Sequence, residues 1–128
     1  MSKLKLIAKT YMLNNGKILA LKRSATDAHR PLTWDIPGGA VDYGESPLEG
    51  AKREAVEEVG ATLTNLELLD VVSEVYPEKQ VITVLYKAEV SDTTIKLSPE
   101  HDEHSWLPRE EFIKLDMPIK YINAAKII

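Results

Sequence analysis

A short segment in the middle of the chain constrains the fold most, because residues at both of its ends define a helix. Ser46 can cap the helix N-terminus, Pro47 suits the first helical position, and Glu49 completes a Ser-x-x-Glu capping box. Gly60 readily adopts the left-handed conformation that ends a helix. The sequence therefore predicts an α-helix over residues 47–59.

This helix is expected to carry two different faces. An apolar stripe faces the core when residues advance by about 100° each, and here it comprises Leu48, Ala51, Ala55 and Val59. Glu54, Glu57 and Glu58 share a neighbouring stripe, where like charges cost roughly 0.2–0.5 kcal/mol per pair. Arg53 can offset part of that repulsion by pairing with Glu57. Hard divalent cations prefer oxygen ligands, so the three carboxylates form a candidate metal site.

The remaining sequence predicts strands before and after this helix. Alternating or continuous apolar patterns indicate strands at residues 3–12, 17–22, 34–36, 66–75, 81–90 and 95–97. Asn15-Gly16 favours a tight hairpin between the first two. Residues 24–33 and 98–104 are expected to be loops, Pro37-Gly38-Gly39 a turn, and short helices to begin at Pro108 and near Pro118. This order predicts an α+β domain with a mixed sheet covered by helices.

Composition narrows the function. The chain has 128 residues, enough for one domain over residues 1–128, a net charge of −4 and no cysteine. Disulfides, zinc–thiolate sites and thiol catalysis are therefore excluded, and the acidity argues against a nucleic-acid partner. The N-terminal stretch has no continuous apolar block, so we expect no signal peptide, no membrane association and a cytoplasmic location.

The spacing of Gly39, Glu45 and residues 53–61 (Arg-Glu-Ala-Val-Glu-Glu-Val-Gly-Ala) resembles the 23-residue Nudix box of MutT-like proteins. Ala55 and Ala61 stand where that family usually has larger aliphatic residues. Residues 34–38 and 100–106 also resemble the family. The resemblance implies a compact α/β/α sandwich with a mixed β-sheet, in which the box forms a loop–helix–loop motif.

The resemblance also implies hydrolysis, with Mg²⁺ or Mn²⁺, of a pyrophosphate bond in a nucleoside diphosphate linked to another group. The compact length favours a (d)NTP, which would give a monophosphate and pyrophosphate. ADP-ribose or a nucleotide sugar (hinted at by Pro77) and a dinucleoside polyphosphate (hinted at by Tyr76) are alternatives. A non-catalytic nucleotide-sensing module is the alternative of another class, and the retained carboxylates argue against it. Dimers are common in the family, but no sequence feature locates an interface.

By resemblance, the metal ligands are Glu54, Glu57, Glu58 and the backbone carbonyl of Gly39. Arg53 would orient these carboxylates, and Glu45 would order the loop through Arg53. The general base would be Glu54 or a carboxylate of a later loop, either Glu103 or, less favoured, Glu100.

Several residues outside this set are weaker candidates. Arg23 and Arg30 could bind substrate phosphates, although exposed loop arginines are common. Tyr43, in the box loop, is a candidate substrate contact. Both Trp34, which could otherwise stack on a base, and Trp106 are expected to pack in the core. His101 and His104 could assist catalysis, but the prediction favours exposed loop histidines.

Overall fold

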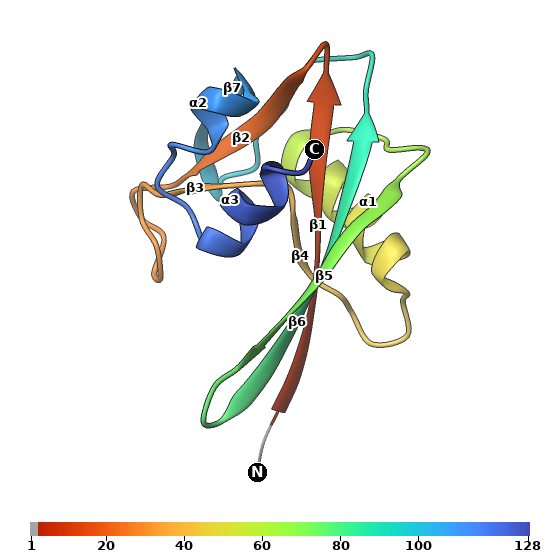
Figure 1. The fold of residues 1–128 in the computed structure, drawn as a ribbon, viewed down its shortest axis with the longest axis vertical. Helices are drawn as coiled ribbons and strands as arrows, with labels where there is room; N and C mark the ends of the chain where they lie inside the picture. The colour runs from red at the N-terminus through yellow and green to blue at the C-terminus, as the bar shows by residue number, and fades with distance from the viewer. Residues whose placement is uncertain (1–2) are drawn as a thin grey trace.

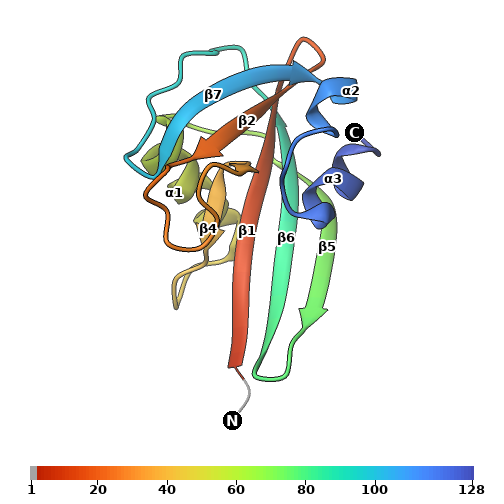
Figure 2. The same cartoon turned by 90° about the vertical axis from the view of Figure 1, so that its left-hand side faces the viewer.

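The computed structural model describes residues 3–128, which form a mixed β-sheet with helices on both faces (Figures 1 and 2). The elements are β1 (Lys3–Asn14), β2 (Lys17–Arg23), β3 (Trp34–Asp35), β4 (Gly38–Ala40), α1 (Pro47–Val59), β5 (Glu67–Val75), β6 (Lys79–Glu89), β7 (His101–Pro108), α2 (Arg109–Phe112) and α3 (Ile119–Ala125). Helix α1 lies on one side of the sheet, and α2 and α3 lie on the other (Figure 2). The predicted α+β class is confirmed.

Strand β1 organises the sheet because it has three neighbours. The strand order is β3-β2-β1-β6-β5, with β4 paired to β1 and β7 paired to β2. β1 runs parallel to β6 along nearly its whole length. On its other edge, β1 pairs with β2 only at Leu13 and Asn14, and with β4 at residues 7–9. β2 therefore leaves β1 after the hairpin, and β4 takes its place beside the lower part of β1.

Local predictions around the hairpin and the central helix are confirmed. Asn15 and Gly16 have φ values of 49° and 76°, as a tight hairpin turn requires. α1 spans Pro47–Val59 with both capping-box hydrogen bonds present, and Gly60 ends it at φ 72°. Leu48, however, is 39% exposed, because the buried stripe of the helix is rotated toward Glu58.

Three predictions about secondary structure are wrong. Residues 95–97 form no strand, and the expected loop at 98–104 contains the start of β7. β7 is hard to recognise because its first half is polar: residues 102–104 are exposed on a strand that pairs only with β2. Gly38 and Gly39, expected in a turn, belong to β4, where a Cβ on Gly38 would lie 2.2 Å from the Ala8 carbonyl oxygen. Glycine thus allows β4 to approach β1.

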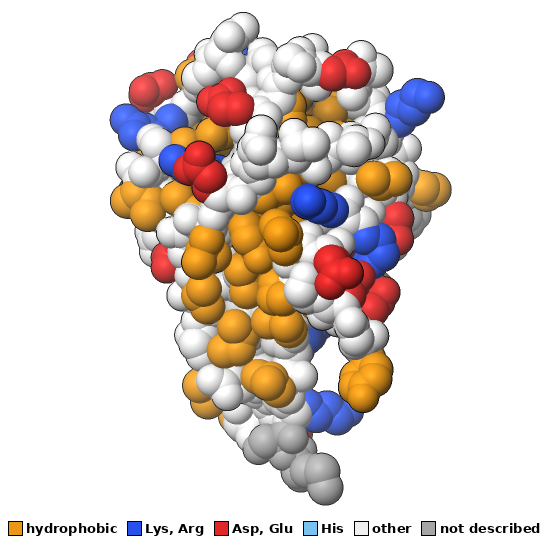
Figure 3. All heavy atoms as spheres, turned by 90° about the vertical axis from the view of Figure 1, so that its right-hand side faces the viewer, with side chains coloured by type: hydrophobic (Ala, Val, Ile, Leu, Met, Phe, Trp, Pro, Cys, Tyr) orange, Lys and Arg blue, Asp and Glu red, His pale blue; other side chains and the backbone are white. Residues whose placement is uncertain are grey.

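The lower ends of β1, β5 and β6 extend beyond the helices (Figures 1 and 2). Figure 3 shows apolar side chains gathered on one face of this extension. Three exposed apolar side chains of β1 and β5 are Leu4 (70% exposed), Val71 (51%) and Val75 (77%). Among residues 3–128, no helix is both long and apolar enough to cross a membrane.

Candidate active site

A cleft of about 560 Å³ lies between α1, β4, the lower part of β1 and the start of α3. Its acidic wall consists of Glu54, Glu57 and Glu58 from α1. Basic side chains reach it from several other elements: Lys5, Lys9, Arg23, Arg30, Lys79 and Lys120. The cleft therefore brings a carboxylate row and a set of cations together around one space.

Arg53 ties the helix to the loop that precedes it. Its guanidinium donates to Glu45 at 2.7 and 3.1 Å, and to the Ala40 carbonyl at 3.0 Å. The Nη1 atom also donates to Glu54 at 3.1 Å and to Glu57 at 3.2 Å. The predicted pairing of Arg53 with Glu57 and its contact with Glu45 are both confirmed. Hydrogen bonds from Arg53 hold the pKa of Glu45 below its usual range.

Glu58 differs from the other two carboxylates because it is buried, with 6% of its surface exposed. The backbone N–H of Gly38 donates to its Oε1 atom at 2.9 Å. Burial raises the pKa of Glu58 to about 8, although the nearby Lys9 ammonium acts in the opposite direction. A bound cation would favour the ionised form of such a group.

Gly39 provides the close approach between β4 and α1. A Cβ at this position would lie 2.9 Å from the Glu54 carboxylate, so any larger residue would push that side chain away. The glycine therefore lets a carboxylate and a backbone segment lie side by side in the cleft.

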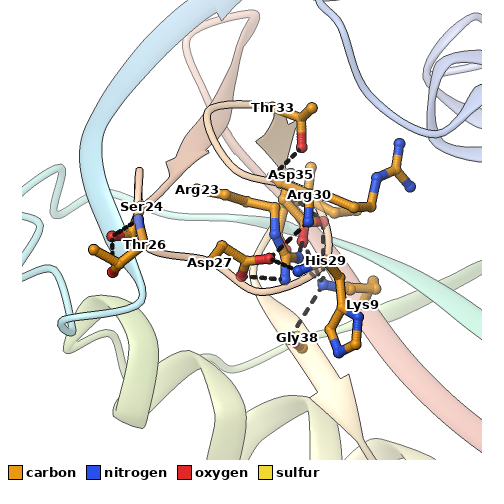
Figure 4. A network of polar contacts seen from close by, with 11 residues as sticks. Lys9, Arg23, Ser24, Thr26, Asp27, His29, Arg30, Thr33, Asp35 and Gly38 are labelled. Carbon is orange, nitrogen blue, oxygen red and sulfur yellow. Dashed lines mark hydrogen bonds and ion pairs between the residues drawn. The ribbon is translucent and has the colours of Figure 1, made fainter.

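A second charged network, missed by the sequence analysis, borders the cleft (Figure 4). Lys9 lies in β1 and is only 7% exposed. Its Nζ atom donates to both Asp35 carboxylate oxygens, at 3.1 and 3.2 Å. Arg23 donates to Asp35 and to Asp27, each at 2.7 Å. Asp35, between apolar Trp34 and Ile36 in a short strand, was the available sequence signal of a buried charge.

The remaining predicted site residues fall into two groups, those that line the cleft and those that lie outside it. Arg23 and Arg30 both line the cleft, and Arg30 forms no ion pair with any residue from 3 to 128. Tyr43 is fully exposed and lies outside the cleft lining, because the box loop projects away from it. Glu103 also lies outside: the register of β7 with β2 sets it opposite Lys22, at 3.9 Å. Glu100 reaches the cleft instead.

The aromatic and histidine predictions have mixed outcomes. Trp34 is partly buried against the core, as predicted, and also lines the cleft. Trp106 packs against the core cluster beside α1, as expected. His104 is exposed, but His101 is buried, lines the cleft and has no hydrogen-bond partner for Nδ1 in the described structure. Burial lowers the pKa of His101.

Comparison with known proteins identifies the family, since the NUDIX domain model matches residues 4–126. The chain is a MutT-like Nudix hydrolase. It is 36% identical over 109 residues to mouse bis(5′-nucleosyl)-tetraphosphatase, covering 80% of this chain and 73% of that protein. It is 31% identical over 75 residues to Escherichia coli 8-oxo-dGTP diphosphatase, covering 59% of this chain and 58% of that protein.

Solved structures agree with this assignment. The MutT protein of Methanosarcina mazei superposes with a TM-score of 0.86 and 30% sequence identity, covering 98% of this chain and 92% of that one. The Nudix fold, with its loop–helix–loop box and mixed sheet, is therefore the fold of this chain.

Nudix hydrolases generally need a divalent metal, and the donor atoms of this site fit one. The available groups are carboxylate oxygens and backbone carbonyls, which are ligands for hard cations. Among residues 3–128, no three acidic or histidine side chains already converge on one point. Glu54 and Glu57 instead share the Arg53 guanidinium, while Glu58 is held by the Gly38 N–H.

Proposed function

We propose that this Nudix hydrolase cleaves a pyrophosphate bond of a nucleoside 5′-polyphosphate, most simply a (d)NTP, to a monophosphate and pyrophosphate. The observation that supports this is the acidic α1 wall facing basic side chains across one cleft. Carboxylates alone would repel a polyphosphate, so divalent cations must lie between them. Arg30, Lys5 and Lys79 are available to bind the outer phosphoryl oxygens.

Glu54, Glu57, Glu58 and the Gly39 carbonyl would hold Mg²⁺ or Mn²⁺. When bound, the metal would neutralise the negative charge that accumulates on the phosphoryl oxygens during hydrolysis. Arg53 restrains the carboxylates on the helix face, and Gly38 restrains Glu58 through its N–H. The chain thus contributes positioning and charge, which are the main protein contributions in phosphoryl transfer.

A carboxylate must also accept the proton of the attacking water. Glu54 is our first choice for this base, since it lies in the cleft beside Gly39. Glu100 is the second, because it lines the cleft from the later loop whereas Glu103 does not. Comparing Glu100→Gln with Glu103→Gln tests this ranking, and we expect the larger fall in kcat for the first.

A dinucleoside polyphosphate is the second candidate substrate. Two aromatic side chains, Trp34 and Tyr76, line the same cleft, so each could stack on one base. Similarity to the mouse tetraphosphatase favours this alternative. Pro77, the hint toward ADP-ribose, lies in the turn between β5 and β6, where a proline has an ordinary structural role.

The experiment is product analysis over a panel of NTPs, dNTPs, 8-oxo-dGTP, ADP-ribose and diadenosine tetraphosphate. Each is incubated with Mg²⁺ or Mn²⁺, and with EDTA as the control. Adding inorganic pyrophosphatase distinguishes pyrophosphate from phosphate as the leaving product. We expect metal-dependent release of a monophosphate and pyrophosphate from at least one triphosphate. Nucleotide binding without turnover of any compound would instead favour a sensing module.

A further inference from the structure

The Lys9 ammonium makes an unusual set of contacts for a lysine in the middle of a strand. Besides the two Asp35 oxygens, its Nζ atom lies 3.2 Å from the Ile36 carbonyl and 3.2 Å from the Gly38 carbonyl. All four oxygens belong to β3, β4 and the link between them. A single buried cation from β1 therefore holds this whole segment (Figure 4).

The segment that Lys9 holds also contacts the acidic wall. The N–H of Gly38 donates to Glu58, and the backbone of Gly39 lies against the Glu54 carboxylate. Lys9 makes no hydrogen bond to the Glu54 or Glu58 carboxylate. It binds the backbone segment that contacts both of them. A shift of Gly38 would move Glu58 or break this hydrogen bond, because the N–H···O contact is buried away from water that could replace it.

The burial of Lys9 argues that these contacts matter. A lysine is rarely buried this fully, and the loss of hydration must be offset by good partners. Strand pairing does not require a lysine at position 9, because β1 pairs with β4 and β6 through backbone hydrogen bonds. An apolar side chain would fill the space, yet could not bind two carbonyl oxygens and a carboxylate at once.

We propose that Lys9 is a positioning residue, which fixes the Gly38–Gly39 backbone so that Glu54 and Glu58 are preorganised for divalent metal. This inference rests on the proposed metal site. Residues that orient metal ligands typically contribute 10- to 100-fold in metal affinity or activity. Lys9 would act on the metal carboxylates through the backbone, and not by touching the substrate.

The test compares Lys9→Met, which keeps the length of the side chain and removes its charge, with the exposed Lys3→Met on the same strand. Mn²⁺ affinity is measured by electron paramagnetic resonance, with thermal unfolding as a check on folding. We expect the Mn²⁺ Kd to rise at least about 10-fold in Lys9→Met and to stay within twofold in Lys3→Met. In turnover assays kcat should fall while the nucleotide KM changes little. A folded Lys9→Met protein with wild-type Mn²⁺ affinity would overturn the proposal.

Amide hydrogen exchange at Gly38 provides a readout that needs neither metal nor substrate. We expect the Gly38 N–H to be protected in the wild-type protein and to exchange at least about 10-fold faster in Lys9→Met. If Lys9→Met does not fold, Lys9→Arg is used, because it keeps the charge but cannot present one nitrogen to all four oxygens. Unchanged Gly38 exchange in the folded variant contradicts the role of Lys9. Absence of Mn²⁺ binding and of turnover in the wild-type protein, with Gly38 exchange still dependent on Lys9, would instead contradict the proposed function.

Discussion

Two charge networks meet at the cleft, and they differ in solvent exposure. The Arg53 network lies along α1 and its preceding loop, where the Arg53 side chain is 28% exposed and Glu57 is 54% exposed. The Lys9–Asp35–Arg23 network is deeper, with Lys9 and Asp35 side chains 9% and 6% exposed. Exposed ion pairs contribute little to stability, whereas a buried charge that loses its partner is costly. We therefore expect the first network to matter mainly for activity, and the second for both folding and activity.

The largest expected effect is that of Asp35→Asn. This change removes the carboxylate shared by Lys9 and Arg23, and it leaves the buried Lys9 ammonium without its charged partner while Arg23 keeps Asp27. Breaking a buried pair in this way costs about 3–5 kcal/mol in the free energy of unfolding. Urea unfolding of Asp35→Asn and wild type measures it. A loss below about 1 kcal/mol would show that the two networks do not differ in the way described.

Glu54→Gln and Glu58→Gln should each lower kcat by at least about 100-fold at saturating metal, the range expected for loss of a general base or a metal ligand. Neither should unfold the protein, since Gln keeps the size of the side chain. Steady-state kinetics with Mg²⁺ and Mn²⁺ measures the change, with the exposed Glu110→Gln on α2 as the matched control. Near-normal turnover in both variants would contradict the assignment of the acidic wall.

Arg53→Ala should separate activity from stability. Arg53 binds Glu45, Glu54 and Glu57, so its loss frees the carboxylates and the box loop. We expect kcat to fall roughly 10- to 100-fold, as for other residues that orient ligands. The unfolding free energy should change by only about 1 kcal/mol, because the pairs are partly exposed. A large destabilisation with normal kcat would contradict the expectation that the Arg53 network matters mainly for activity.

The pH dependence of stability should report the buried Glu58 in metal-free protein. Burial raises the pKa of Glu58 to about 8 in the folded protein, whereas in the unfolded chain its pKa is the ordinary glutamate value of about 4.5. The folded state therefore binds more protons between these values, and stability is lost as pH rises through this window. Glu58→Gln has no titrating group at this position, so its stability does not fall with pH through this window for this reason. We expect its Tm to exceed that of wild type by the largest margin near pH 8, with a smaller margin at pH 5. An equal margin at both values would contradict the raised pKa.

The smallest effect is expected at Tyr43, which lies outside the cleft lining. Tyr43→Ala should change the nucleotide KM by less than twofold. Arg30→Gln, which removes a cleft-facing guanidinium, should raise KM about 10-fold, consistent with a charge-assisted hydrogen bond of about 1.5–3 kcal/mol. Initial-rate kinetics on the best substrate of the panel compares the two. A larger effect at Tyr43 would mean that the box loop closes over the substrate.

Sequence alone determined the central helix and the grouping of its charged side chains. Ser46, Pro47 and Gly60 define the helix ends through local hydrogen bonds and backbone preferences, and the structure confirms those ends. The spacing of Glu54, Glu57 and Glu58 puts them on one side of that helix, and Arg53 binds where an i,i+4 pairing predicts. These features depend on residues within about two helical turns, so no long-range information is needed.

Only the tertiary structure decided what surrounds that helix. Strand alternation groups Lys9 with Lys5, yet pairing with β4 and contact with Asp35, 26 residues away, bury Lys9 and leave Lys5 exposed. The register of β7 on β2 likewise separates Glu100, in the cleft, from Glu103, outside it. Such contacts join distant segments, and their geometry depends on strand pairing and on bulges that a local pattern does not specify.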